Sequence, residues 1–581
     1  MNTNRFYNLK LALYCSSIII GAGLLTLPLA AARLGFLPLL LVIVVGGIWM
    51  AIVNKRTADS LFSYVNRKSR KKAQVIAAGL RVASDGAEPS GPLVDHEAII
   101  ADHVRKHGSR ILPELTLDAG FGMSGRMTIL LGMFLYVFFA DIGYVLIGSR
   151  SLAFIARFVT GNFPKAFPAL FFGGLLLFIL SLLFDRLWTK PFLLRGTLKK
   201  IFVMAGAWLV GISFLGYYLS EFLNQLGTVW MDALGLTLFT GAVLAGMFTN
   251  TNEHSMSSSG DLTDHHTVNV VVMLAEILLL VVTILIVLTV VNANHILVPF
   301  FGIAEKSLSL SALPAWSKLI GLVIFAFVGT GLFNLLSYPK LFEKPKPGSM
   351  SRLVAVVILG TVIPMIVYLA WTITSSTVLT PSELTVLDSA KEYITMGIAR
   401  KFAEINTTAA LLITIFGYSV ALLAVTSACN GFTESLADQI SATLHGITNA
   451  KWTASNQGNL KMRLIILVAA IAAAFAVDHL IKIDISSILS VAGNAGGGLL
   501  VLILPFFLPE PGSRKSRWSS VMIGLMTAIT LTLLSLTVVD IAAVQDVASA
   551  VVAAISIVIA ISISVMAIWL IRSEPPSDGT D

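Results

Sequence analysis

The stretch Ile18–Ala30, IIIGAGLLTLPLA, lies inside the first long apolar run of the chain and decides the fold. Its surroundings are typical of a membrane-spanning helix, yet Gly21, Gly23 and Pro28 are poor helix formers that lie close together. Each glycine costs a helix about 1 kcal/mol relative to alanine. The sequence therefore predicts that the first membrane helix is interrupted at these glycines.

The composition of the whole chain indicates an integral membrane protein. Of the 581 residues, 56% are hydrophobic and only 12% are charged, and the mean hydropathy is +0.85. A soluble domain carries about 25% charged residues. Apolar runs of about 18 residues or more, each long enough to cross a bilayer as a helix, recur along the chain. Alternating segments typical of membrane strands are not seen, so we expect an all-α fold.

The apolar runs predict about twelve to fourteen transmembrane helices, depending on whether the short, glycine-rich segment 234–250 crosses the membrane. The candidate spans are 10–33, 36–53, 127–149, 167–185, 201–219, 234–250, 268–292, 318–338, 353–375, 408–428, 462–478, 485–508, 518–539 and 547–571.

Lysine and arginine gather in alternate loops between these spans, after spans two, four, eight and twelve. Loops on the cytoplasmic side carry this excess. Both termini are therefore expected in the cytoplasm, and the protein is expected in the cell membrane. Loops 150–166 and 251–267 fit less well, because the first holds three basic residues and the second holds acidic residues without any basic one.

The interrupted stretch has a counterpart later in the chain. Gly21-Ala22-Gly23-Leu24 recurs as Gly329-Thr330-Gly331-Leu332, and a proline follows each motif. By the predicted topology the two spans run in opposite directions, which is the pattern of inverted-repeat transporters with a binding site near the midplane. Unwound amides favour a carboxylate, and free carbonyls favour an ammonium group or a cation. Close helix packing through small residues is the alternative interpretation.

Four segments resemble the amino acid/auxin permease family of the amino acid–polyamine–organocation superfamily. GAGLLTLPLAAARLGF (21–36) resembles its first helix, and FLYVFFADIGYVLIG (134–148) its third. FAFVGTGLFNLLSYPKLFEK (325–344) resembles the sixth helix, and VILGTVIPMIVYLAW (357–371) the seventh. The resemblance implies the LeuT fold, with two inverted five-helix repeats, and secondary transport of amino acids driven by H⁺ or Na⁺.

On this resemblance the chain divides into six parts. They are 1–53 with the first two helices, a cytoplasmic loop 54–126 with an amphipathic helix near Asp95–Lys106, 127–292 with an inserted hairpin at about 201–250, the second repeat 318–508, a C-terminal helix pair 518–571, and a cytoplasmic tail 572–581. The hairpin departs from the family pattern, as does Asn334, which stands where the family often has proline.

Several side chains beside the two motifs are candidates for binding the substrate. Asp141 is a carboxylate within an apolar span, where an ionisable group is costly and usually functional, so it is expected to hold a substrate ammonium or carry a proton. Its alternative role is an interhelical hydrogen bond. Tyr144 shares its face, whereas Tyr136 is expected to face elsewhere. The remaining candidates are Thr26 and Asn334 and two residues beside the second motif, Phe325 and Phe327, although lipid contact is the commoner role for such aromatic residues.

Three residues are candidates for the coupling ion. Glu276 lies in the span 268–292 and suits a proton carrier, or it reaches water near the membrane surface. Thr414 and Ser419 offer hydroxyl oxygens for a bound Na⁺, although such groups more often bond the backbone of their own helix.

Other functional classes find little support in the sequence. Motifs of metalloproteases, serine hydrolases and phosphate-binding loops are missing, so an enzyme is not expected. The pair His103 and His107 is a weak metal signal, and neither a metal, another cofactor nor a nucleic acid is expected. The main prediction is a permease for amino acids, neutral or aromatic, with the bilayer as its surroundings. A non-transporting amino acid sensor and a transporter of another small solute remain alternatives, and the oligomeric state is open.

Overall fold

The computed structural model describes residues 2–21, 23–83, 122–162, 265–293, 309–328, 338–343, 350–389, 393–448, 456–478, 484–503 and 517–544, with isolated positions between them. This part of the chain is helical throughout, and no strand occurs in it. Its helices are α1 (Asn2–Ile19), α2 (Gly23–Thr26), η1 (Leu27–Ala30), α3 (Ala31–Leu34), α4 (Phe36–Ala83), α7 (Gly122–Asn162), α11 (His265–Ala293), η4 (Leu310–Ala312), α12 (Leu313–Phe327), η5 (Pro339–Phe342), α14 (Arg352–Ser376), α15 (Pro381–Ser389), α16 (Ile394–Ala403), α17 (Thr407–Thr448), α18 (Asn456–Ala476), α19 (Ile485–Val491), the π-helix η8 (Ala492–Ile503) and α21 (Arg517–Val544).

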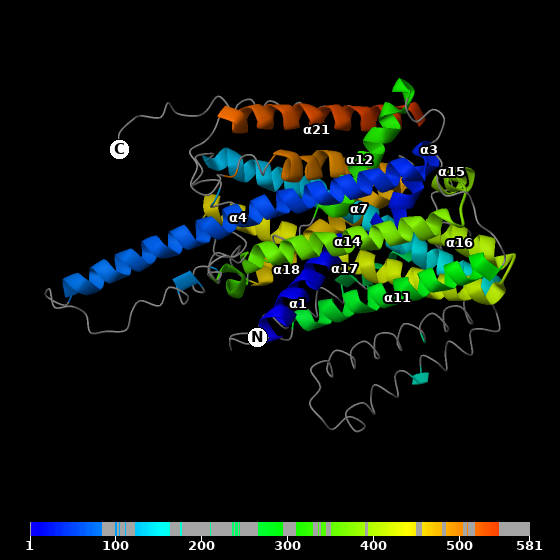
Figure 1. Ribbon diagram of the computed structural model, residues 1–581, viewed down its shortest axis with the longest axis horizontal. Coiled ribbons are helices and arrows are strands. Elements are labelled where there is room, and N and C mark those ends of the chain that lie inside the picture. Colours follow the sequence, from blue (N-terminus) through cyan, green and yellow to red (C-terminus); the bar gives the residue numbers. More distant parts are fainter. Residues whose placement is uncertain are drawn as a thin grey trace.

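The long helices, among them α4, α7, α14 and α17, lie side by side in a bundle (Figure 1). Five stretches of the described chain are long and apolar enough to cross a membrane, namely 36–75, 129–151, 310–327, 352–376 and 485–502. Shorter apolar helices accompany them. The expected all-α class and the apolar, membrane-type helices are thus confirmed. The predicted spans 167–185, 201–219, 234–250 and 547–571 fall wholly or mostly outside the described residues, as do the tail 572–581 and most of Asp95–Lys106.

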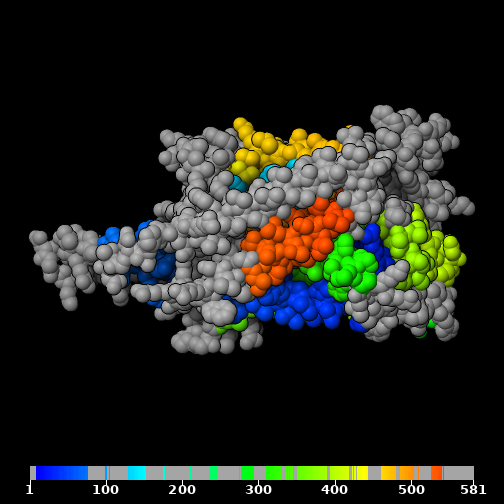
Figure 2. Space-filling model, turned by 90° about the horizontal axis from the view of Figure 1, so that it is seen from above, coloured from blue at the N-terminus to red at the C-terminus, as the bar shows by residue number. Residues whose placement is uncertain are grey.

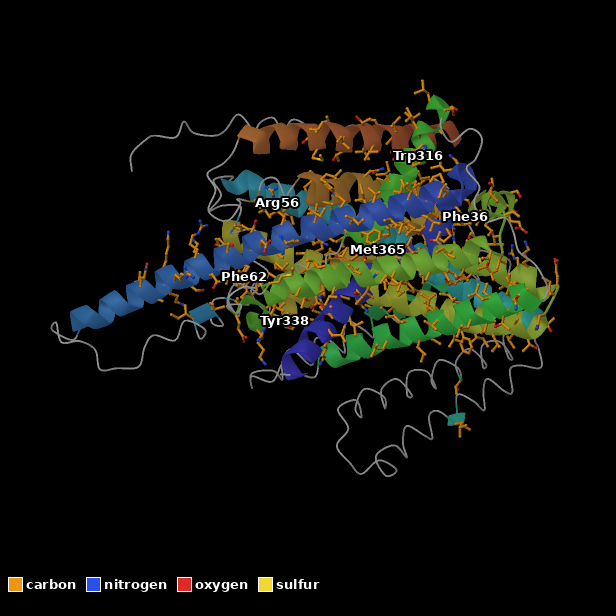
Figure 3. The ribbon with its side chains drawn as sticks, in the orientation of Figure 1. Phe36, Arg56, Phe62, Trp316, Tyr338 and Met365 are labelled. Carbon is orange, nitrogen blue, oxygen red and sulfur yellow. The ribbon has the colours of Figure 1, made fainter. Side chains whose placement is uncertain are left out.

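Helix α4 extends beyond the bundle at one end, and the short helices α15 and α16 lie at the other (Figure 1). We call these the α4 end and the α15 end. Phe36 marks the start of α4 toward the α15 end, whereas Phe62 lies toward the extension (Figure 3). The chain reverses into α4 at Gly35, whose φ of 92° is a left-handed conformation that favours glycine.

The length of α4 corrects one prediction. The sequence predicts a span that ends at residue 53 and then a loop, but the helix continues without interruption to Ala83. The segment after residue 53 contains no proline and is rich in lysine, arginine and alanine, which are good helix formers. Leu61 and Val65 on its inner side are buried. Polarity shows where the membrane ends, and helix propensity shows that the helix continues.

Glycines set the closest crossings at the centre of the bundle. A side chain on Gly493 of η8 would collide with the backbone carbonyl of Gly321 in α12. A side chain on Gly496 would collide with the backbone of Tyr136 in α7. The glycines therefore let η8 touch the backbones of two other helices. On the outer face, α21 lies next to the start of α12 (Figure 2).

Candidate functional site

The first membrane helix is broken where the sequence predicts it. Helix α1 ends at Ile19, and the amide of Gly21 donates to the carbonyl oxygen of Ile19 at 2.9 Å in a tight turn. Helix α2 starts at Gly23. The amide of Leu24 then donates to the carbonyl oxygen of Gly21 at 3.2 Å. The expected interruption is confirmed, but the Gly21 amide is not available to a ligand carboxylate in this conformation, because the tight turn already uses it.

Helix α12 ends where the second motif begins. Its last helical residue is Phe327, and Val328 is extended with φ −64° and ψ 93°. The motif residues Gly329, Thr330, Gly331 and Asn334 lie outside the described residues, as does Ala22 of the first motif. The helical end at Phe327 is consistent with a second break at this level.

Helices α1 and α12 approach each other from opposite ends of the bundle. Cys15 adjoins Gly360, and Ile19 adjoins Tyr368, so α1 runs in the same direction as α14. Helix α14 leads toward α15, whereas α12 begins at the α15 end, where Lys318 contacts α15. Helices α1 and α12 therefore run in opposite directions, as the predicted topology requires.

A tyrosine of α14 joins the ends of both helices. The hydroxyl of Tyr368 donates to the carbonyl oxygen of Ile19 at 2.7 Å and lies 3.3 Å from that of Ala326. Backbone carbonyls at a helix end have no partner within their own helix and need one from elsewhere. Tyr368 supplies that partner, and it ties the end of α1 to the end of α12.

Tyr136 of α7 has the same role at α12, which corrects a prediction. Its hydroxyl donates to the carbonyl oxygen of Phe325 at 2.8 Å and lies 3.0 Å from that of Val328. The position of Tyr136 in the sequence predicts that its side chain faces away from the site. Tyr136 and Tyr144 are eight residues apart, which on a helix separates their directions by only about 80°, and their long side chains converge.

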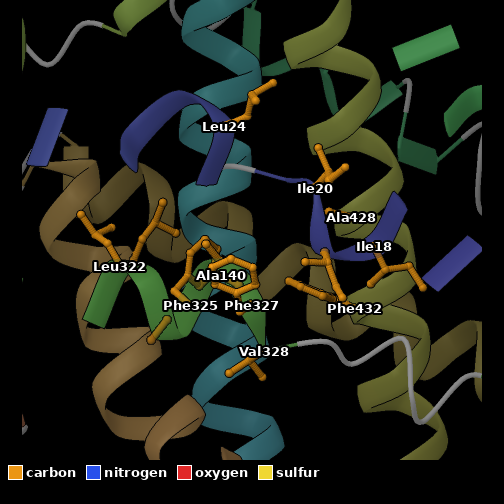
Figure 4. Packing of buried hydrophobic residues seen from close by; sticks show 14 of the residues in the cluster. Ile18, Ile20, Leu24, Ala140, Leu322, Phe325, Phe327, Val328, Ala428 and Phe432 are labelled. Atoms are coloured by element: carbon orange, nitrogen blue, oxygen red, sulfur yellow. The ribbon is translucent and has the colours of Figure 1, made fainter. Parts of the chain in front are cut away.

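The aromatic rings of three helices meet beside the first break. Tyr136 and Tyr144 of α7 both contact Phe325 of α12, with ring centroids 5.7 and 6.1 Å apart. Both also contact Phe432 of α17, at 5.3 and 5.5 Å. Figure 4 shows the hydrophobic residues of α12 and α17 gathered around the broken segment. We call Tyr136, Tyr144, Phe325 and Phe432 the aromatic cluster.

Phe327 does not join this cluster. Its ring packs edge-on against Tyr368, with centroids 5.5 Å apart, and it adjoins Gly47 of α4. The side chains of Phe325 and Phe327 therefore serve different contacts, Phe325 toward α7 and Phe327 toward α4 and α14.

The glycines of the first motif bring its backbone against two tyrosines. A Cβ atom on Gly21 would lie 2.6 Å from the Tyr144 hydroxyl, and one on Gly23 would lie 2.9 Å from the Tyr368 hydroxyl and 2.8 Å from the Cβ of Ala326. Any larger residue at either position requires these neighbours to move. The motif thus provides close approach as well as a break in the helix.

Asp141 is a fully buried carboxyl beside the aromatic cluster. It is 0% exposed, and among the described residues only the thiol of Cys429, a weak donor, approaches its oxygens as a hydrogen-bond partner. Its electrostatic neighbours are Tyr136 and Tyr144 of its own helix and the thiol of Cys429 in α17. Cys429 follows Ala428, whose Cβ approaches Gly21. Asp141 therefore lies close to the first break, without a cation that would stabilise its charge.

The structure describes the side chain of only one of the three predicted coupling-ion residues, Thr414. The Thr414 hydroxyl donates to the carbonyl oxygen of Ala410 at 2.7 Å, so it bonds its own helix, as the alternative interpretation held. The side chains of Ser419 and Glu276 lie outside the described residues, although their backbones belong to α17 and α11. Thr26 is buried at the junction of α2 and η1.

A buried ion cluster lies at the α15 end, and the sequence does not predict it. The ammonium of Lys318 in α12 lies 2.7 Å from Asp484, which precedes α19, and 3.5 Å from Asp388 of α15. Burial alone would raise the pKa of Asp484, but the charge of Lys318 and hydrogen bonds from Ser486 and Ser487 outweigh it and lower that pKa. The cluster joins the start of α12 to α15 and α19.

Tyr368, Phe432 and Cys429 are further residues that sequence reasoning missed. A tyrosine in the middle of an apolar span needs a hydrogen-bond partner, so the position of Tyr368 carried a signal. No signal distinguished Phe432 or Cys429 from packing residues. Among the described residues, no three His, Cys, Asp or Glu side chains lie close enough together to hold a metal ion. Neither a scan against models of known protein families nor a search of curated proteins gives a match to this chain.

Proposed function

We propose that the protein is a secondary active transporter of amino acids with a LeuT-type arrangement, coupled to H⁺ or Na⁺. The observation that carries the proposal is the meeting of two oppositely directed helix ends, α1 at its break and α12 just before the second motif, at the hydroxyl of Tyr368. Interrupted helices at membrane depth are tolerated where their backbone lines a cavity or is buried in protein. In inverted-repeat transporters they mark the substrate site.

The chemistry around the breaks suits a zwitterion. Carbonyl oxygens of Ile19 and Ala326 converge on one point and can accept from an ammonium group once Tyr368 releases them. Backbone amides of the first break lie beside these carbonyls, and they can donate to a carboxylate once the turn at Gly21 opens. An amino acid presents both groups on one carbon, and so fits a site in which acceptors and donors lie side by side.

The aromatic cluster supports a neutral or aromatic substrate. Phe325 and Phe432 offer ring faces, and Tyr144 adds a hydroxyl near Gly21. The breaks are tightly packed in this conformation, so substrate entry requires movement of α1 or α12. Such movement around a fixed site is how this class of transporter alternates between its two sides.

The orientation follows from charge. Arg56, Arg67 and Lys72 follow the apolar part of α4, on the way to the α4 end. Basic residues favour the cytoplasmic side, so we place the α4 end in the cytoplasm and α15 outside. The protein would then be a multi-pass protein of the cell membrane.

A non-transporting sensor is the second candidate, because the extension of α4 offers a large surface outside the bundle. Counterflow separates the two. Proteoliposomes preloaded with one unlabelled amino acid at a time are placed in the same labelled amino acid, without any ion gradient. A transporter accumulates label transiently, whereas a sensor binds it without accumulation. No counterflow for any member of a panel of neutral, aromatic, acidic and basic amino acids would contradict the proposed function.

A further inference from the structure

We infer that Asp141 carries the proton that drives transport, so that the coupling ion is H⁺ rather than Na⁺. The inference rests on the proposed function and assigns its coupling step to one side chain. It begins from the burial of Asp141, which is 0% exposed in α7, and from its two oxygens, whose one hydrogen-bond partner among the described residues is the weak thiol donor of Cys429.

The surroundings of this carboxyl contain groups that are neutral near pH 7. They are the phenols of Tyr136 and Tyr144 on the same helix and the thiol of Cys429 on α17. The aromatic cluster adds the rings of Phe325 and Phe432 to both tyrosines. An ionised carboxylate here would lack both water and a counter-charge, which is costly in an apolar interior.

Three described cations on α7 and on neighbouring helices pair with other carboxylates, and none of the three is an electrostatic partner of Asp141. These pairs are Arg150–Asp478, Lys318–Asp484 and Arg463–Glu434. Asp141 therefore keeps its proton while the site is closed. It can lose that proton only when water or a cation reaches it.

Movement at the first break provides such access. The Tyr144 hydroxyl and the Cβ of Ala428 both contact Gly21, and Asp141 and Cys429 are close neighbours of these two residues on the same helices. Displacing α1 from α7 and α17 therefore uncovers the carboxyl. An O–H bond forms with a proton supplied by water on the side of higher proton concentration. The same bond breaks, and the proton passes to water, after the site opens to the other side.

A substrate ligand role for Asp141 is disfavoured by its position. The converging carbonyls of Ile19 and Ala326 meet the hydroxyl of Tyr368, whereas Asp141 meets the thiol of Cys429. Tyr136 and Tyr144 are electrostatic neighbours of both Tyr368 and Asp141. A proton on Asp141 and an amino acid at the carbonyls would then occupy adjacent places. Simultaneous binding of both is what symport requires.

The test compares wild type, Asp141→Asn and the control Asp59→Asn in proteoliposomes. Asp59 lies on the extension of α4, where its side chain is 39% exposed and pairs with Lys55. With the membrane potential held at zero, a pH difference of one unit drives a roughly tenfold accumulation of a substrate that moves with one proton. We expect this accumulation for wild type and Asp59→Asn. For Asp141→Asn we expect counterflow without accumulation.

Each other outcome has a definite meaning. Full pH-driven accumulation by Asp141→Asn, or accumulation by wild type that needs a Na⁺ gradient, would overturn the proton assignment while leaving the transporter intact. Folded Asp141→Asn without substrate binding would make Asp141 a substrate ligand, and would overturn it as well. Absence of counterflow in wild type would instead reject the proposed function.

A second variant covers failure of Asp141→Asn to fold. Asp141→Glu keeps a titratable group and lengthens the side chain by one methylene. We expect it to retain pH-driven accumulation with a shifted pH profile. Infrared spectra of wild type should show a carboxylic acid band shielded from water, and Asp141→Glu should shift this band. An unchanged band and an unchanged pH profile would overturn the inference.

Discussion

The hydroxyl of Tyr368 in α14 donates to the carbonyl oxygen of Ile19, the last helical residue before the break in α1, at 2.7 Å. The same hydroxyl lies 3.3 Å from the carbonyl oxygen of Ala326, near the end of α12. One side chain thus holds both interrupted helices in a closed arrangement. A substrate ammonium would compete with Tyr368 for these carbonyl oxygens.

Removing this hydroxyl should therefore affect function more than stability. Tyr368→Phe loses a hydrogen bond worth about 0.5–1.5 kcal/mol, so thermal unfolding should shift only slightly, while the apparent affinity for the amino acid changes several-fold. Tyr393→Phe is the matched control, because the Tyr393 hydroxyl donates to the carbonyl oxygen of Leu146 at 3.3 Å. Equal effects of both variants on amino acid affinity would show that Tyr368 only contributes stability.

Gly23 should not tolerate a side chain. Gly23→Ala brings a Cβ within 2.9 Å of the Tyr368 hydroxyl and 2.8 Å of the Cβ of Ala326, so counterflow should fall strongly, and Gly23→Val should abolish it. Gly241→Val is the control, since no atom of the described residues lies within 4 Å of a Cβ at Gly241. Size-exclusion profiles of the purified variants check folding. Normal counterflow by Gly23→Val would leave the glycine as a packing residue and move the site elsewhere.

The ion cluster at the α15 end should make stability depend on pH. The pKa of Asp484 is lowered in the folded protein, so its contribution is present above the ordinary value of about 3.9 and declines as the pH falls below it. Asp484→Asn should lower the melting temperature at pH 7, and the difference from wild type should persist at pH 5 and shrink below about pH 4. A difference that is independent of pH would contradict the assigned ion pairs.

The glycines of η8 should contribute to the stability of the fold. Gly493→Ala sets a methyl group against the carbonyl of Gly321, and Gly496→Ala sets one against the backbone of Tyr136. Overpacking costs about 1–3 kcal/mol, so both variants should unfold at lower temperature. Gly417→Ala is the control, because the nearest described atom to its Cβ would be the Thr395 methyl at 3.3 Å, with no backbone atom among its nearest neighbours. Wild-type melting temperatures for both η8 variants would contradict the close helix contact.

The sequence predicted the break in α1 because glycine and proline are conspicuous within an apolar run. It also identified Asp141, since a carboxylate at that depth is unusual, and Tyr144 by its position one turn later. It misjudged Tyr136, because residue spacing gives directions from the helix axis but not the reach of a long side chain. It missed Tyr368 and Phe432, whose contacts come from helices far apart in the sequence.

The extension of α4 illustrates a second limit. Residues after Val53 are too polar to lie in a membrane, and this polarity predicts that the chain continues there as a loop. Polarity and helicity are independent properties, so a membrane boundary need not be a helix boundary. The cluster of Lys318, Asp388 and Asp484 was equally hidden, because its members are far apart in the sequence and meet only through folding.

The central claim is that the interrupted helices form a transport site. Its most direct test is uptake of labelled neutral and aromatic amino acids into proteoliposomes under an inward pH gradient and, separately, an inward Na⁺ gradient, for wild type and Gly23→Val. The account predicts concentrative uptake by wild type under at least one gradient and none by folded Gly23→Val. Wild-type protein that takes up none of these amino acids under either gradient would contradict it.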